Sequence, residues 1–217
     1  MGKNNSNNRR DAIQQLGLLT AGMFMLPLVA CNEQEKQSAT TSTTKAPLPF
    51  LTNPQPPLKP GNMGSDMRTL IRSAQTNGQF SCVEAVLGPK KIAGSPHKHA
   101  DLDELMYVLE GTASVLMGDE VVEVPTGSWH LRPREIVHVV WNNSSTVNLR
   151  LIDMYFNQNF EDYLEEVYHQ IIPEVIKNSL SFDDPKVARR IAALDKKFGL
   201  TYYHEKQQAL VYKYGLS

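Results

Sequence analysis

The chain has 217 residues, enough for one globular domain with an appendage, and a formal net charge of −1. Because the sequence contains no basic block, nucleic acid is not expected as a partner. A disulfide framework is excluded, since only two cysteines are present, Cys31 in an N-terminal leader and Cys82 in a strand-like run.

Residues 1–31 have the pattern of an export signal peptide. A polar start ending in Arg9-Arg10 precedes an uncharged apolar run over residues 16–30 and a small-residue cleavage context. The run is short for a membrane-spanning helix, which needs about 20 residues. The segment is therefore predicted to be removed.

The end of this leader, Leu28-Val29-Ala30-Cys31, resembles a bacterial lipobox, in which the cysteine is lipidated. The resemblance implies lipidation of Cys31 and an exported protein, lipid-anchored at the periplasmic or extracellular face of the bacterial cell envelope. The alternative for Cys31 is a free thiol in a spanning anchor. The stretch around Arg9-Arg10 resembles a twin-arginine export motif, although Ala12 and Gln14 replace its usual Phe and Lys. An ordinary export signal is the alternative there.

Residues 32–60 are predicted to be a disordered tether. Residues 32–45 are rich in Glu, Gln, Ser and Thr and lack apolar periodicity. Residues 46–60 contain six prolines, which stiffen the chain towards polyproline II. In an alternative interpretation, Phe50 and Leu51 pack on the following domain or on a second subunit.

Residues 61–156 are predicted to be an antiparallel β-barrel. Eight strand-like runs are separated by Gly, Pro, Asn and Asp, at residues 68–74, 80–88, 104–111, 112–118, 120–124, 128–133, 138–142 and 147–156. Such a series indicates an all-β sandwich or barrel. Gly118-Asp119 fits a tight hairpin turn.

Four side chains in this region form a candidate metal site. His97 and His99 are two residues apart, so both imidazoles project from the same face of an extended strand. Glu104 opens the next strand-like run, and His138 opens a later one. Three neutral imidazole nitrogens and one carboxylate oxygen suit a divalent first-row metal with one or two open positions.

The spacing of these residues resembles the two motifs of the cupin superfamily. The first motif, G, five residues, HxH, three or four residues, E, six residues, G, is matched by His97, His99, Glu104 and Gly111, with Lys91 at the leading glycine. The second motif, G, five residues, PxG, two residues, H, three residues, N, is matched by Gly127, Pro133, His138 and Asn142, with Glu135 at the middle glycine. Both departures fall at turns and neither falls at a ligand. The resemblance implies a jelly-roll barrel with a metal inside its mouth.

A barrel followed by a helical tail containing NFEDYLEEV resembles the bacterial cupins described as quercetin dioxygenase-like. This resemblance implies an oxygenase in which His97, His99, Glu104 and His138 hold Fe, Mn, Ni, Co or Cu, with zinc as a further option. It implies a small apolar or aromatic substrate, enolic or phenolic and flavonol-like. It also implies a catalytic role for Glu104, as the base that takes the substrate's hydroxyl proton, and a homodimer. Two alternatives stay open, a non-catalytic metal- or ligand-binding envelope lipoprotein and a cupin isomerase, epimerase or decarboxylase.

Other barrel residues have both a functional and a structural interpretation. Met106, Val108 and Val140 fall on the ligand face and would make an apolar wall around the metal or an ordinary barrel core. His130 would contact substrate or be structural. Arg132 and Arg134, which flank Pro133 and are placed near the barrel rim, would grip an anionic group or be solvated.

Residues 157–217 are predicted to be a helical segment. An apolar stripe at helical spacing begins at Phe160, and a second helix has Asp184-Pro185 at its start and Gly199 at its end. The helices and a polar tail would pack on the barrel or cover its mouth. His169 and His204 have no partner spacing that would make them ligands.

Overall fold

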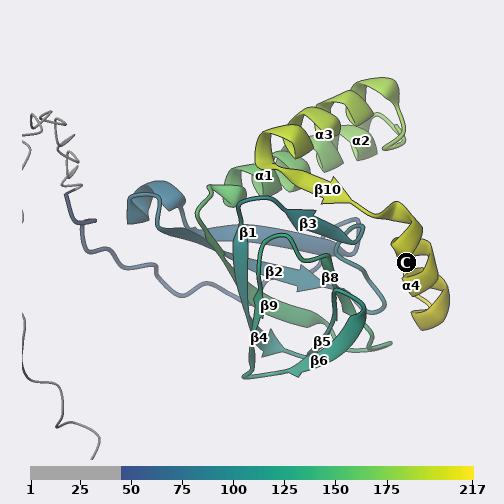
Figure 1. The fold of residues 1–217 in the computed structure, drawn as a ribbon, viewed down its shortest axis with the longest axis horizontal. Coiled ribbons are helices and arrows are strands. Elements are labelled where there is room, and N and C mark those ends of the chain that lie inside the picture. Colours follow the sequence, from purple (N-terminus) through teal and green to yellow (C-terminus); the bar gives the residue numbers. More distant parts are fainter. Residues whose placement is uncertain (1–44) are drawn as a thin grey trace, which may run out of the picture. The chain divides into compact units, whose positions relative to one another are not determined.

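The computed structural model describes residues 45–217, and the centre of this part is a barrel of two five-stranded antiparallel sheets (Figure 1). In hydrogen-bonded order, one sheet contains β1 (Ser65–Ile71), β2 (Phe80–Leu87), β9 (Leu149–Phe156), β4 (Asp103–Glu110) and β7 (Trp129–Arg132). The other contains β10 (Leu200–Tyr202), β3 (His97–His99), β8 (His138–Asn142), β5 (Thr112–Met117) and β6 (Glu120–Pro125). The predicted all-β antiparallel fold is confirmed.

Alternation of side chains decides which residues fill the barrel. Along β9 every second residue is buried, from Leu149 to Tyr155, as expected for a strand with one face on a core. Buried apolar residues from several strands form one packed cluster, which consists of Leu87, Met106, Val108, Ala113, Val115, Val124, Val140, Leu149 and Leu151. The expected hairpin turn at Gly118-Asp119 joins β5 to β6, and Gly118 adopts φ 64° there.

The C-terminal segment begins with a continuous helical stretch. It consists of α1 (Phe160–Glu166), the π-helix η2 (Val167–Ile171) and α2 (Ile172–Lys177). The next helix, α3 (Pro185–Phe198), begins and ends as predicted. The Asp184 side chain accepts hydrogen bonds from the first-turn amides, and Gly199 ends the helix with φ 65°. A 3₁₀ helix, η1 (Ser73–Thr76), joins β1 to β2.

The tail after α3 is not simply the polar extension that the sequence predicted. Residues 200–202 form β10, which pairs with β3, and α4 (His204–Tyr214) follows. Leu210 and Leu216 pack with Trp141 of β8. Phe160 of α1 and Phe198 at the end of α3 pack in a second cluster with Tyr155 of β9. The C-terminal segment is thus joined to the barrel by a strand and by two apolar contacts.

Residues 45–60, from the region predicted as a tether, contain no helix or strand but are hydrogen-bonded to the first sheet. The Leu58 amide donates to Glu84, and Arg68 donates to the Pro56 carbonyl. Phe50 and Leu51 remain exposed. The predicted signal peptide, the predicted lipidation site at Cys31 and residues 32–44 lie outside the described part.

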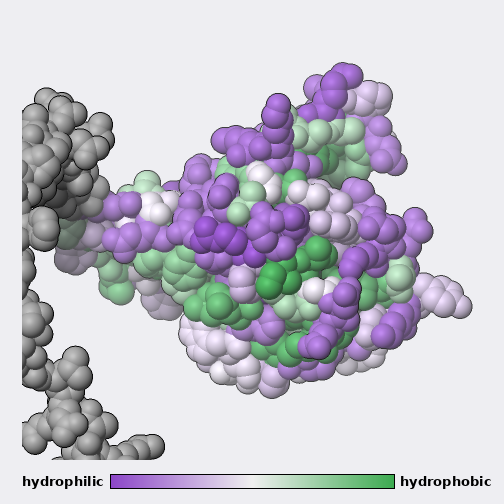
Figure 2. Space-filling model, viewed as in Figure 1, coloured by the Kyte–Doolittle hydropathy of each residue, from purple (hydrophilic) through white to green (hydrophobic). Residues whose placement is uncertain are grey.

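The described surface differs in character between its parts. Hydrophobic residues, green in Figure 2, gather in patches over the barrel, whereas the surface of the C-terminal helices is largely hydrophilic. Trp129 and Leu131 of β7 are among the exposed apolar side chains. Within residues 45–217, no helix combines the length and apolar character needed to span a membrane.

Candidate metal centre

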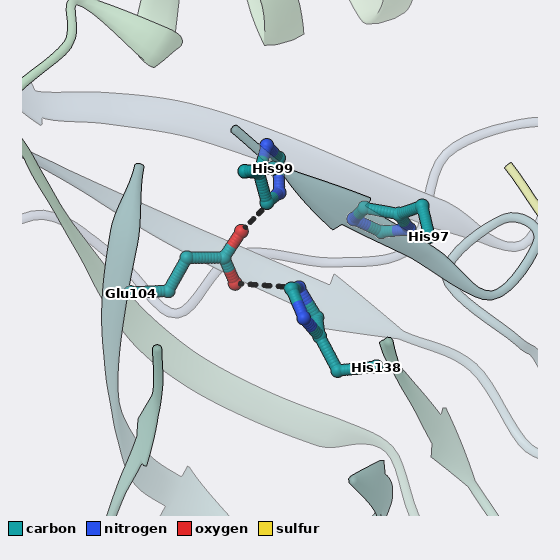
Figure 3. A group of neighbouring side chains, drawn as sticks. All are labelled: His97, His99, Glu104 and His138. Atoms are coloured by element: carbon teal, nitrogen blue, oxygen red, sulfur yellow. Dashed lines mark ion pairs between the residues drawn. The ribbon is translucent and has the colours of Figure 1, made fainter. Parts of the chain in front are cut away.

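The four predicted ligand residues come together at one end of the barrel interior (Figure 3). His97 and His99 lie on β3, Glu104 is the second residue of β4, and His138 is the first residue of β8. His97 pairs directly with His138 across the two strands. One ligand atom from each of the four residues lies within 4.8 Å of the others. The geometry therefore makes a cluster that could hold a metal ion.

Two of the three histidines, His97 and His138, are oriented by backbone carbonyls. His97 Nδ1 lies 2.8 Å from the Ser95 carbonyl oxygen, and His138 Nδ1 lies 2.9 Å from that of Ile136. Such contacts set the ring orientation and leave Nε2 as the metal-facing nitrogen. The Nε2 atoms of His99 and His138 are buried and, within the described residues, have no hydrogen-bond partner outside the cluster. Buried polar atoms are normally satisfied, so these nitrogens have the environment expected of metal ligands.

The carboxylate of Glu104 lies between two of the rings (Figure 3). Its Oε1 atom is 2.8 Å from His99 Nε2, and its Oε2 atom is 3.6 Å from His138 Nε2. Burial alone would raise the pKa of Glu104, but Arg132 and His138 outweigh burial and hold that pKa well below its usual range. Glu104 is therefore anionic at neutral pH, the form in which a carboxylate can bind a metal ion.

His97 is kept in the form that binds metal. Burial lowers the pKa of His97 to about 3, with further contributions from neighbouring His138 and His99. The imidazole is consequently neutral over the whole physiological range. His97 is also the least buried of the four residues, since His99, Glu104 and His138 are each at most 5% exposed.

Arg132 is not at the barrel rim, where the sequence placed it, but inside the barrel and 1% exposed. Its guanidinium donates to Glu104 Oε2 at 2.7 Å and to Asp153 Oδ1 at 2.5 Å. Burial opposes the charge of Arg132, but Asp153 and Glu104 outweigh burial and raise its pKa. A buried arginine needs such partners, because an unpaired charge there is costly.

Arg134 lies outside the barrel, where it forms an ion pair with Asp103. Glu135 follows Arg134 in the sequence and occupies the position of the middle glycine in the second motif. Its backbone adopts φ 62°. Its amide donates to the His99 carbonyl at 2.8 Å. The turn therefore keeps the left-handed conformation that glycine favours and links the two motifs.

Aromatic side chains of the C-terminal segment cover the histidines, an arrangement the sequence analysis did not identify. The Phe160 ring packs edge-on against His99 at a centroid distance of 4.9 Å, and Tyr202 lies 5.5 Å from His97. The Tyr202 hydroxyl is 2.8 Å from that of Tyr163, which donates to Asp195 at 2.9 Å. Backbone pairing of β10 with β3 places Tyr202 opposite His97.

The other barrel residues that the sequence analysis singled out also have side chains that point into the barrel. Met106, Val108 and Val140 lie in the packed apolar cluster of the barrel. His130 points inward from β7, and its Nδ1 atom is buried without a hydrogen-bond partner. Burial, Arg132 and His138 lower the pKa of His130.

His169 and His204 lie outside the cluster. His169 contacts the Met67 carbonyl, and His204 contacts Ser95. His169 also lines a cavity of about 510 Å³ between the start of β1 and α2, which contains none of the four predicted ligands.

Residues 83–155 match the family model described as "Cupin domain". This stretch is thus similar to a cupin domain; it runs from within β2 to near the end of β9 and includes all four residues of the cluster. No curated protein sequence matches the chain.

Several solved structures are similar to part of the chain. KdgF from Halomonas sp. is 17% identical, with a TM-score of 0.41 over 46% of this chain and 86% of that one. The polyketide cyclase RemF from Streptomyces resistomycificus is 24% identical, with a TM-score of 0.40 over 46% and 70%. A predicted oxalate decarboxylase from Thermotoga maritima is 18% identical, with a TM-score of 0.40 over 42% and 79%.

Proposed function

We propose that this cupin-domain protein is a metal-dependent oxygenase that acts on a small enolic or phenolic substrate. The observation that supports the proposal is the convergence of three imidazoles and one carboxylate within 4.8 Å, with buried nitrogens that lack any other partner. Iron, manganese, nickel, cobalt and copper suit this donor set, and zinc is the redox-inactive alternative. A bound divalent metal would supply positive charge that stabilises a substrate anion.

The residues around the cluster favour a planar, largely apolar substrate. Tyr202 and Phe160 place aromatic rings against His97 and His99, and aromatic rings stack well on other planar groups. His97 is the most exposed ligand, so the side of the cluster shared by His97 and Tyr202 is the side from which a substrate would approach. Phe160 lies against His99, which is fully buried, so bulk water is excluded from that ligand.

Glu104 has two proposed roles with different structural requirements. As a ligand, it must stay beside the three histidines. As a base, it must bring an oxygen within hydrogen-bond reach of the substrate hydroxyl. The contacts of its two oxygens therefore bear on which role it can perform.

Elemental analysis of the purified full chain, beside the His97→Ala variant, tests the proposal. We expect about one redox-active metal per chain in the parent and a sharp loss in the variant. The metal-loaded protein should then consume oxygen with a flavonol or another enolisable compound. Metal binding without oxygen uptake would indicate a cupin isomerase or decarboxylase. No metal, even after refolding with metal supplied, would indicate a binding role.

We further propose that the protein is held at the bacterial cell envelope by a lipid on Cys31. The support is the lipobox-like sequence at residues 28–31, which lies at the end of an apolar run too short to span a membrane. Labelling of cells with a fatty-acid analogue should mark the parent protein and not the Cys31→Ala variant. Equal labelling of both would contradict this anchor.

A further inference from the structure

Two arginines flank Pro133, and each pairs with a carboxylate at the start of β4. Arg134 is exposed and pairs with Asp103, whereas Arg132 is buried and pairs with the adjacent residue, Glu104. The two pairs are chemically alike and close in sequence. The two pairs differ in burial. They also differ in that Glu104 belongs to the candidate metal cluster and Asp103 does not.

The guanidinium of Arg132 contacts only one of the two carboxylate oxygens of Glu104, Oε2. Arg132 Nε lies 2.7 Å and Nη2 lies 2.6 Å from Oε2, so two nitrogens of the guanidinium approach the same atom. The other oxygen, Oε1, faces His99 Nε2 at 2.8 Å. Oε2, which lies 3.6 Å from His138 Nε2, is therefore held by Arg132, whereas Oε1 has no contact with the guanidinium and is the oxygen left for a metal.

Arg132 is itself anchored. Its Nη2 donates to Asp153 Oδ1 at 2.5 Å, and its Nη1 lies 3.4 Å from the sulfur of Met106. Register explains this arrangement, because Glu104 pairs with Arg132 across β4 and β7, while Met106 pairs with Asp153 across β4 and β9. Three neighbouring strands thus fix the guanidinium, and movement of Glu104 would leave buried charges unpaired.

We propose that Arg132 is a positioning residue that holds Glu104 on the metal through Oε1. Glu104 is then a permanent ligand and not a base that leaves the metal for the substrate. This inference rests on the proposed metal-binding function and assigns one of the two roles of Glu104. Charge-assisted hydrogen bonds to a buried carboxylate are strong and directional, which suits a residue that must not rotate.

Cobalt binding to the full chain tests the proposal, because the visible spectrum of bound Co²⁺ reports its ligands. Arg132→Met keeps an unbranched apolar stem, although a shorter one, and removes every hydrogen-bond donor. We expect about a 10- to 100-fold loss of Co²⁺ affinity, the range typical of partners that orient a ligand, together with a changed spectrum. The matched control, Arg134→Met, removes the exposed pair and should leave affinity and spectrum unchanged.

A double-variant cycle separates positioning from a general structural role. If Arg132 acts through Glu104, the combined Glu104→Gln and Arg132→Met variant should bind Co²⁺ about as weakly as Glu104→Gln alone. Additive losses would overturn the proposal. Should Arg132→Met fail to fold, Arg132→Lys retains a positive charge without the forked geometry and should give an intermediate affinity and an altered spectrum.

Two failures are distinguishable. A parent protein that binds no Co²⁺ overturns both the metal-binding function and the role of Arg132. A parent that binds Co²⁺, with Arg132→Met and Arg132→Lys unchanged in affinity and spectrum, overturns the role of Arg132 alone.

Discussion

The two ends of the barrel interior are built from the same strands but differ in chemistry. β4 carries Glu104 at one end and Val108 further along, and β8 begins with His138 and continues to Val140. At one end the inward side chains are histidine, glutamate, arginine and aspartate, and at the other they are aliphatic and tightly packed. One alternating pattern thus produces a polar end for chemistry and an apolar end for stability.

This difference shows that the buried side chains at the two ends are stabilised in different ways. The apolar end needs only close packing, and each buried side chain contributes by leaving water. The polar end needs partners for every charge, and the Glu104–Arg132–Asp153 group supplies them on the barrel side. What stays unsatisfied is a set of imidazole nitrogens. Substitutions at the two ends should therefore affect different properties.

The largest expected effect on stability comes from the apolar end. Leu151 is 2% exposed in the packed cluster, and Leu151→Ala should lower the free energy of unfolding by about 2–5 kcal/mol through the lost transfer energy and the cavity left behind. Urea unfolding of the metal-free protein measures this loss. Metal stoichiometry of the folded variant should stay at the parent level, and a loss of metal here would mean that the two ends are not independent.

At the polar end, His138→Ala should mainly reduce metal binding. Removal of one of four ligands is expected to weaken metal affinity by about 100-fold or more, since even indirect partners contribute 10- to 100-fold. His130→Ala is the internal comparison, because His130 also points into the barrel but lies outside the cluster. Titration with Co²⁺ should show near-parent affinity for that variant. Equal losses in both variants would mean that the ligand set is wrong.

The sequence predicted elements with strong local signals well. α3 has a side-chain cap at Asp184, proline in its first turn and glycine at its end, so its limits were read correctly. The long alternation in β9 was equally clear. By contrast, β10 has three residues and forms through pairing with β3, a contact with residues about 100 positions away that no local pattern reveals.

Around the cluster, the spacing of the histidines and Glu104 predicted which side chains meet, but not what surrounds them. On β7 the usual pattern is reversed, with Trp129 and Leu131 exposed and Arg132 buried. Arginines are seldom buried, so a reading from residue type placed Arg132 at the rim. Only the register of β7 against β4 shows that it faces Glu104.

A smaller effect should come from the aromatic cover. Tyr202→Phe retains the ring beside His97 and removes the hydroxyl contact with Tyr163, so stability should fall by about 1 kcal/mol, the net value of one hydrogen bond. Metal affinity should be unchanged. Thermal unfolding measures the stability, and Co²⁺ titration measures the metal affinity. A tenfold loss of affinity would show that the Tyr202 hydroxyl, and not only its ring, contributes to metal binding.

The last effect concerns the pH dependence of the polar end. The pKa of His97 is lowered in the fold from 6.5 to about 3, so between these values the unfolded chain binds more protons at this residue than the folded protein does. The contribution of His97 to stability is therefore constant above about pH 6.5 and is lost as the pH falls, by at most about 1.4 kcal/mol per pH unit. The His97→Gln variant lacks this contribution, so the metal-free parent should lose more stability than the variant between pH 7 and pH 5. Urea unfolding at the two pH values measures the difference, and parallel losses in both proteins would show that His97 does not resist protonation in the fold.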